Sequence, residues 1–266
     1  MFDVREYDFC MSLGGSCAIA MQLKQRGLRI ASMPLDWIRG RGNSRYLDTI
    51  GKMLENRFEG WCAFDNLVPM PEDLDRPKAT DPLEVRAWDK VHDIGFYHDF
   101  RYDIFGNGGR EYYEGIAARY RRRIDRLYDI LSRATNVIAI VIGPDEPIPR
   151  DDVVRLKSRL DALRPGLTFT LVALGFNAAA DYEQGSLAEG LLIREFKRDQ
   201  HAYDYTKTTL AWDFLEDVKL SGRIVPEKES KRNATKGMSF WYRIHRKLYL
   251  HCKKVLERRN EGVRRS

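Results

Sequence analysis

The sequence predicts an α/β domain with a mixed or mostly parallel sheet flanked by helices, followed by a C-terminal basic amphipathic helix. Continuous apolar, β-branched runs at 136–142 and 167–174 are typical of strands buried on both faces of a sheet. Between them, residues 151–163 carry apolar side chains at helical spacing. A strand, a helix and a strand in this order predict a right-handed crossover between parallel strands. A strand at 191–196 and a short helix at 211–220 complete the predicted domain.

The N-terminal part of the chain predicts a strand, a tight turn and a helix in succession. The strand covers residues 4–11, the turn 12–17 and the helix 18–26, which Gly27 ends. A second helix is predicted over 44–56, where apolar residues recur every three or four positions. The N-terminal part of the chain is thus predicted to contain two helices after the first strand.

The next part of the chain is predicted to be less regular. Residues 57–82 contain four prolines, which exclude a long helix and predict a loop region packed on the core. Aromatic and β-branched residues at 94–100 predict a strand. On a regular strand, His98 shares one face with its two phenylalanine neighbours, and Asp99 points to the opposite face.

Residues 114–133 predict the clearest helix of the chain, with an apolar stripe at spacings of three and four. Its other sides carry the arginines Arg119, Arg121, Arg122, Arg123 and Arg126. We interpret them as a solvated basic face, which is usual for a surface helix. The alternative is a patch that binds an anionic substrate.

Composition bounds the class of protein. The chain has 266 residues, of which 43% are apolar and 32% are charged, as expected of a folded soluble domain. No run of about 18 apolar residues predicts a membrane span, and the N-terminus lacks the features of a secretory signal. The four cysteines form no CxxC pair, so neither a zinc knuckle nor a disulfide framework is predicted. A reducing cytoplasm is the expected compartment.

Charge is concentrated in the C-terminal tail. Residues 227–266 carry a net charge of +9 in a chain of +6, which leaves −3 for residues 1–226. We therefore predict no specific nucleic-acid binding, and divide the chain into a domain at 1–222 and a linker with a tail at 223–266. The helix predicted over 238–259 could lie on an anionic membrane surface, peripheral to the inner face, or bind an acidic partner. Docking on the domain is the equally weighted alternative.

A cysteine stands at the point where the first turn meets the first helix. Unpaired amides and the helix dipole add partial positive charge there, and both favour the thiolate, which is the nucleophilic form. We therefore predict Cys17 as a catalytic nucleophile, with a buried structural cysteine as the alternative. Its own amide, together with Ser12 or Ser16, would form an oxyanion hole.

A cysteine nucleophile needs a base, and His98 is the preferred candidate among the five histidines. Its apolar strand neighbours would limit solvation and help to set a base near neutral pH. A carboxylate should orient the imidazole, and Asp36, Asp99 and Asp103 are all left open. Trp37 is a candidate for the wall of the substrate pocket.

Three motifs occur in a fixed order: SLGGSC at 12–17, PLDW at 34–37 and HDF at 98–100. Together with the arginine-rich helix and the apolar strand after it, they resemble the bacterial family of papain-like cysteine peptidases, a domain family of unknown function. The resemblance covers residues 5–220 and excludes the tail. It implies that the cysteine of the first motif and the histidine of the third act as a Cys–His pair.

The combined prediction is a cysteine-dependent hydrolase, a papain-like peptidase or amidase that acts on a peptide, amide or other acyl substrate without a cofactor. An acyltransferase would use the same acyl-enzyme chemistry with an amine or hydroxyl as acceptor. A binding protein with a structural Cys17 is the non-catalytic alternative. A metal hydrolase using His92-Asp93 and His98-Asp99, or a nucleotide-binding module, is weaker. The sequence therefore predicts no metal site.

Overall fold

The structure is a computed structural model. It describes residues 4–70, 86–100, 102–105, 109–143, 147–178, 181–197 and 210–225. Within these ranges, no helix is long and apolar enough to cross a lipid bilayer. The tail helix predicted over 238–259 lies outside the described residues, so its role at a membrane or an acidic partner stays a prediction. The domain boundary at residue 222 also stays a prediction.

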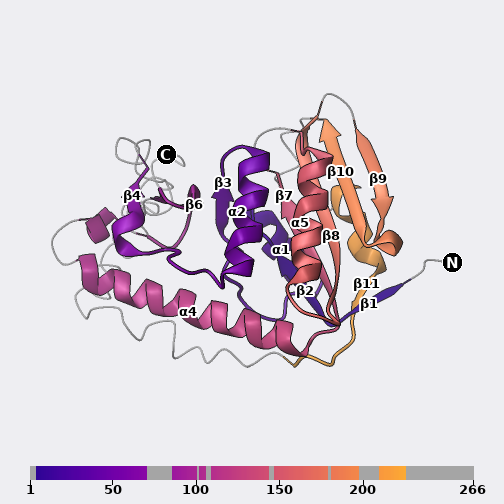
Figure 1. Ribbon diagram of the computed structural model, residues 1–266, viewed down its shortest axis with the longest axis horizontal. Coiled ribbons are helices and arrows are strands. Elements are labelled where there is room, and N and C mark those ends of the chain that lie inside the picture. Colours follow the sequence, from indigo (N-terminus) through magenta and orange to yellow (C-terminus); the bar gives the residue numbers. More distant parts are fainter. Residues whose placement is uncertain are drawn as a thin grey trace, which may run out of the picture.

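A five-stranded sheet forms the centre of the fold and confirms the predicted α/β class (Figure 1). Three neighbouring pairs of strands are parallel, and the strand at one edge is antiparallel. In spatial order, the strands are β2 (Phe9–Ser12), β7 (Asn136–Ile142), β8 (Thr168–Ala178), β10 (Leu191–Lys197) and β9 (Tyr182–Ser186). Strand β7 has the predicted bounds because its unbroken apolar run can be buried on both faces. Strand β9 was not predicted, since its polar residues lie at the exposed edge.

Helices cover both faces of this sheet, and alternate residues of β7 belong to two separate hydrophobic clusters. The odd-numbered residues of β7 pack in one cluster with α2 (Asn43–Glu55), α4 (Gly109–Arg133) and α5 (Arg150–Ala162). The even-numbered residues pack in the other with α1 (Cys17–Gln25) and the 3-10 helix η4 (Leu210–Asp217). The sheet is therefore the middle layer of a three-layer domain.

Short strands form two smaller sheets. The four-stranded one is antiparallel, in the order β3 (Ile38–Gly40), β6 (Ile94–Phe96), β5 (Ala87–Asp89) and β4 (Leu67–Pro69). A parallel pair joins β1 (Arg5–Tyr7) to β11 (Val218–Leu220), so the helix predicted over 211–220 is replaced by η4 and this strand. Three further 3-10 segments are η1 (Phe64–Asn66), η2 (Tyr102–Phe105) and η3 (Leu187–Glu189).

The strand predicted over 94–100 ends at Phe96, and the chain bends over the next three residues. Phe96 and Phe100 are fully buried, whereas His98 is exposed and Asp99 is buried. The prediction that His98 shares a strand face with the two phenylalanines is therefore wrong. Strand β6 pairs with its neighbours over only three residues, so beyond Phe96 no hydrogen-bond ladder keeps the chain extended.

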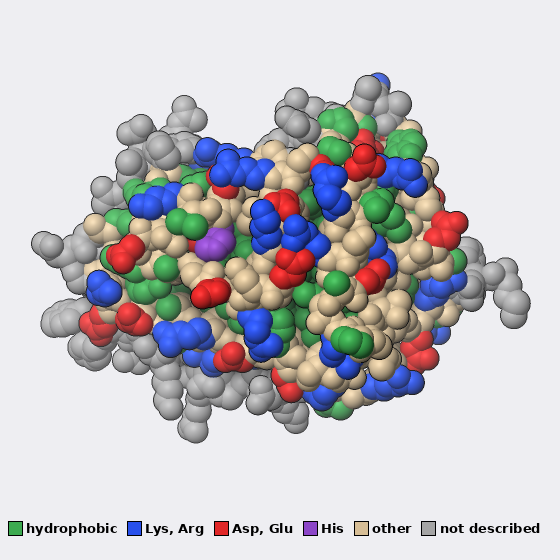
Figure 2. Space-filling view, in the orientation of Figure 1, with side chains coloured by type: hydrophobic (Ala, Val, Ile, Leu, Met, Phe, Trp, Pro, Cys, Tyr) green, Lys and Arg blue, Asp and Glu red, His purple; other side chains and the backbone are tan. Residues whose placement is uncertain are grey.

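The face formed by α2 and α5 carries both signs of charge side by side (Figure 2). Arg159 of α5 pairs with Glu55 and, at 3.1 Å, with Asp48, two acidic residues of α2. Asp48 also pairs with Lys52 at 2.7 Å. The charges on this face therefore offset one another, as is common for exposed ion pairs between neighbouring helices.

A buried aspartate, Asp8, joins the amino ends of β2 and β7 to the segment after β11. Its carboxylate accepts hydrogen bonds from the amide and hydroxyl of Thr135, at 2.7 and 2.8 Å, and from the hydroxyl of Ser221 at 2.6 Å. Burial alone would raise the pKa of Asp8, but the hydrogen bonds outweigh it and lower the pKa to about 2. Asp8 is thus a charged group that stabilises the fold.

We expect Asp8→Asn to lower the free energy of unfolding by about 1–3 kcal/mol at neutral pH, because Thr135 and Ser221 lose a buried, charged acceptor for their hydrogen bonds. The folded pKa lies below the unfolded one, so this stabilisation is complete above about pH 4 and is lost as the pH falls toward about 2. Urea unfolding of both proteins across this range measures the effect. A difference between the two proteins that does not shrink with acidity would contradict the assignment.

Candidate active site

The chain between β2 and α1, residues 12–17, makes a tight turn that we call the cysteine turn. It lies at the carboxyl end of the parallel strands, where α/β folds usually place their sites. Gly14 and Gly15 have positive φ angles of 83° and 92°. A Cβ on Gly15 would lie 1.9 Å from the carbonyl oxygen of Ile142, and one on Gly14 would lie 2.4 Å from the hydroxyl of Tyr46. Only glycine fits at both positions.

Hydrogen bonds fix the cysteine turn to three different elements. The Gly15 amide donates to the carbonyl of Ile38 in β3 at 3.1 Å. The amide of Ile142, at the end of β7, donates to the Gly14 carbonyl at 3.1 Å. Tyr46 of α2 donates its hydroxyl to the carbonyl that precedes Gly14, at 2.9 Å. The turn is therefore held rigidly between the central sheet, the small sheet and a helix.

Cys17 is the first residue of α1, one position before the predicted start of the helix, and it is partly exposed. Ser16 is the N-cap, and its hydroxyl oxygen accepts a hydrogen bond from the amide of Ala18 at 3.2 Å. The other two cysteines in the described part of the chain, Cys10 and Cys62, are buried. Among these three thiols, Cys17 is the one that a substrate can reach.

The thiol of Cys17 does not rest as a stabilised thiolate. Burial raises its pKa, and hydrogen bonds from the Ser16 hydroxyl and from the amide of Cys17 itself lower it by less. Desolvation therefore outweighs the effect of the helix start, which was expected to favour the thiolate. Attack by this sulfur requires a base that removes its proton.

The two serines predicted for an oxyanion hole both serve the cysteine turn. The buried Ser12 accepts a hydrogen bond from the Gly14 amide at 3.1 Å, while Ser16 caps α1. Each hydroxyl still carries a hydrogen that it can donate. Their part in an oxyanion hole stays a prediction, and Ser16, whose hydroxyl bonds to the thiol of Cys17, is the better placed of the two.

Trp37 and His98 meet in space although they are distant in the sequence. Their ring centroids lie 5.6 Å apart, and the rings are nearly perpendicular at 88°. Trp37 precedes β3 and His98 follows β6, and the pairing of Ile38 with Phe96 brings these two strand ends together. Because Ile38 also accepts the hydrogen bond from Gly15, the Trp37–His98 pair and the cysteine turn share one support.

Asp36, a predicted orienting carboxylate, is buried in an ion pair. It lies 2.6 Å from the guanidinium of Arg29 and accepts a hydrogen bond from the Met33 amide at 2.9 Å. Burial raises the pKa of Asp36, and the charge of Arg29 opposes this rise. These contacts hold the loop before β3 together around the Asp36 carboxylate. The neighbouring Trp37 is half-buried on the outer side of this loop.

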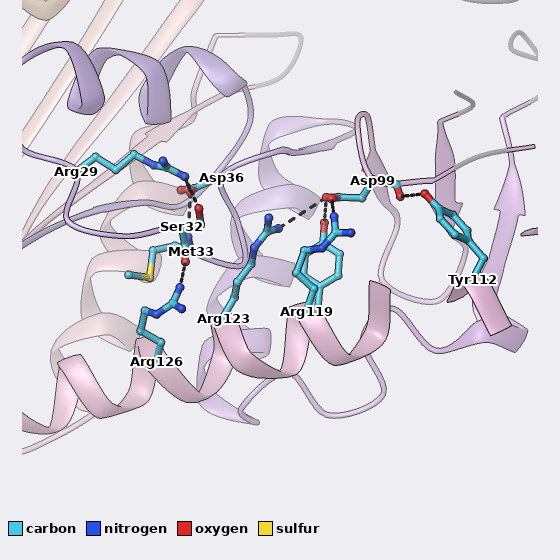
Figure 3. A network of polar contacts seen from close by, with 10 residues as sticks. Arg29, Ser32, Met33, Asp36, Asp99, Tyr112, Arg119, Arg123 and Arg126 are labelled. Carbon is cyan, nitrogen blue, oxygen red and sulfur yellow. Dashed lines mark hydrogen bonds and ion pairs between the residues drawn. The ribbon is translucent and has the colours of Figure 1, made fainter. Parts of the chain in front are cut away.

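Asp99, the second candidate, is buried against α4 (Figure 3). One carboxylate oxygen accepts from Arg119 at 2.6 Å, and the other accepts from the hydroxyl of Tyr120 at 2.6 Å and lies 3.7 Å from Arg123. The third candidate, Asp103, has a side chain outside the described part of the structure. The choice of the group that orients His98 stays open.

The arginine-rich helix does more than present a solvated basic face. Arg119, Arg123 and Arg126 are spaced four and three residues apart on one side of α4 and contact the loops that carry the two buried aspartates (Figure 3). Arg121 and Arg122 are exposed, as predicted. The interpretation as a solvated face is therefore wrong for three of the five. Their shared side of the helix was the available signal.

A further carboxylate, Asp89, was not singled out from the sequence. It is completely buried at the end of β5 and accepts a hydrogen bond from the Cys62 amide at 3.0 Å. The ring of His92 lies 3.0 Å from the same carboxylate, and Asp93 pairs with Arg45 at 3.1 Å. In the part of the chain that the structure describes, no group of three or more His, Cys, Asp or Glu is placed to hold a metal ion.

Comparison with known proteins places this chain in a family. The sequence model of a family described as "Putative papain-like cysteine peptidase" matches residues 8–178. The chain belongs to this family. An uncharacterized protein of Acanthamoeba polyphaga mimivirus is 30% identical over 142 residues, which are 49% of this chain and 59% of the viral protein. The chain thus spans little more than half of that relative, and no solved structure matches.

The match to the papain-like cysteine peptidase family contains the whole candidate site. The cysteine turn, the Trp37–His98 pair and both buried aspartates fall between residues 8 and 178. The family resemblance predicted from the three motifs is therefore confirmed. The viral relative gives no support to a bacterial setting, which stays a prediction.

Proposed function

We propose that this member of the papain-like cysteine peptidase family hydrolyses peptide, amide or related acyl bonds, with Cys17 as nucleophile and His98 as base. One observation carries the proposal. A partly exposed cysteine opens a helix at the carboxyl edge of the parallel sheet, and its turn is hydrogen-bonded to the residue beside Trp37, whose ring contacts His98. Sulfur and imidazole are thus carried by two segments with a common support in β3.

The chemistry follows from the state of the thiol. Because burial keeps Cys17 protonated at rest, His98 takes the proton as the sulfur bonds to the substrate carbonyl carbon. The imidazolium then gives this proton to the departing amine or alkoxide when the scissile bond breaks, which leaves a thioester. Water next attacks the thioester carbonyl and loses a proton to His98, and the acid product departs as the thiol is restored. The Cys17 amide and the Ser16 hydroxyl are the proposed donors to the oxyanion.

The exposure of His98 favours water as the second nucleophile. An imidazole that is open to solvent can activate water directly, whereas an acyltransferase must keep water away from the thioester. The Trp37 ring lies perpendicular to the His98 ring, and His98 is exposed beside it. This observation favours a hydrolase over the acyltransferase that shares its first half-reaction.

The pH dependence of Cys17 alkylation tests the pair. We expect iodoacetamide to modify Cys17 in the wild type at neutral pH with a plateau, because His98 accepts the proton. In His98→Ala, modification should rise only as the thiol ionises, above about pH 8.5. Peptide mass mapping assigns the modified site, with the buried Cys10, whose pKa is raised to about 12, as internal control. Identical profiles in both proteins would refute the Cys–His pair.

A further inference from the structure

The two loops that carry Trp37 and His98 are built alike. Each places a buried aspartate directly beside an aromatic ring: Asp36 precedes Trp37, and Asp99 follows His98. The aspartate side chains are 3% and 7% exposed, whereas Trp37 is half-buried and His98 is exposed. In both loops the chain therefore turns the carboxylate inward and leaves the ring at the outer side, where the two rings meet.

Helix α4 holds both loops from below, through arginines on one side (Figure 3). Toward its N-terminal end, Arg119 donates to Asp99 at 2.6 Å. Two turns later, Arg126 donates to the carbonyl of Ser32 at 3.0 Å, in the loop that leads to Trp37. The Ser32 hydroxyl accepts in turn from Arg29 at 3.0 Å. The two loops are thus attached to one rigid element.

Arg123 stands between these two attachments. Its side chain is 11% exposed, and its guanidinium lies 3.7 Å from the Asp99 carboxylate and 5.1 Å from the centroid of the Tyr120 ring. Figure 3 shows this guanidinium between Asp99 and Asp36, and its positive charge is a minor contribution that opposes the rise in the pKa of Asp36. A planar guanidinium can face two acceptors at once, which the compact ammonium of lysine does less well.

We propose that Arg123 is a positioning residue: from its place on α4 between Asp99 and Asp36, it keeps the Trp37 loop and the His98 loop in register. It contacts no reacting atom. Its consequence for catalysis rests on the proposed function, because the register of the loops sets where the imidazole stands relative to the thiol. Loss of Arg123 leaves two buried carboxylates with one cation fewer, and the loops must then separate or take up solvent.

A spectroscopic signature of the Trp37–His98 contact tests this proposal. The Trp37 ring current shifts the NMR signals of the His98 ring protons. These signals are assigned by their loss in His98→Gln, and in Trp37→Leu they return to their ordinary position. In Arg123→Met we expect these signals to move at least halfway to their position in Trp37→Leu. In Arg123→Lys we expect a smaller displacement. Arg122→Met, an exposed neighbour on the same helix, is the matched control and should keep wild-type signals.

The rate of Cys17 alkylation at neutral pH is a second measurement. We expect this rate to be about tenfold lower in Arg123→Met than in the wild type. A folded Arg123→Met protein with wild-type His98 signals would overturn the proposal. If that variant does not fold, Arg123→Lys decides: displaced signals support the proposal, and unchanged signals overturn it. The NMR measurement does not involve the thiol. It therefore judges Arg123 even if His98→Ala leaves Cys17 reactivity unchanged and the proposed function fails.

Discussion

Replacing His98 with alanine is expected to slow the acylation of Cys17 by about 10²–10⁴-fold at neutral pH. Without the imidazole, a thiol whose pKa is raised by burial must ionise unaided before it can attack. The exposed position of His98 means that the substitution removes its contact with Trp37 and opens no cavity in the core. Release of nitrophenolate from p-nitrophenyl acetate, followed by absorbance, gives the acylation rate.

His92→Ala is the matched control for this prediction. His92 belongs to the same small sheet region, but its ring is held by the buried Asp89. We expect this substitution to lower the free energy of unfolding while the acylation rate stays at the wild-type value. Equal losses of rate in the two variants would indicate a general structural effect and would contradict a specific role for His98.

Gly15→Ala is expected to lower the free energy of unfolding by about 4 kcal/mol or more, or to prevent folding. The new Cβ would meet the carbonyl oxygen of Ile142 at 1.9 Å while φ is held at 92°. That carbonyl lies at the end of β7, inside the central sheet, and cannot move without disturbing the strand. The cysteine turn would have to open, and Cys17 would move with it.

Gly27→Ala separates the two contributions to this loss. Gly27 also has a positive φ, of 71°, but a Cβ there meets no atom within 4 Å. Only the backbone conformation is then unfavourable, at a cost of about 1 kcal/mol. Urea unfolding of the two variants measures the difference. Equal stability of Gly15→Ala and Gly27→Ala would show that the turn does not press against β7.

The parts of the fold with strong local patterns could be predicted from the sequence. Strand β7 has the predicted bounds because the six consecutive apolar residues at 137–142 leave few alternatives. Helix α1 and its cysteine were predicted because a glycine turn precedes a helical pattern. The motifs that contain Cys17 and His98 also indicated the family, because their order along the chain resembles that of the family.

The remaining features depend on contacts between distant segments. The exposure of His98 follows from the short pairing of β6, which no local pattern reveals. The inward direction of Arg119 and Arg123 depends on Asp99, which lies in another element. Asp89 can be buried because its carboxylate accepts a hydrogen bond from a backbone amide and contacts a histidine ring. In a sequence, a charged residue usually indicates an exposed position instead.

Trapping of the acyl-enzyme tests the central claim most directly. The protein is mixed with p-nitrophenyl acetate, quenched in acid during the first turnover, and its peptides are mapped by mass. We predict a single acetyl group on the sulfur of Cys17 in the wild type, no adduct at that position in Cys17→Ser, and slowed formation in His98→Ala. Release of nitrophenolate by the wild type with no acetyl group on Cys17 would contradict cysteine-dependent acyl chemistry.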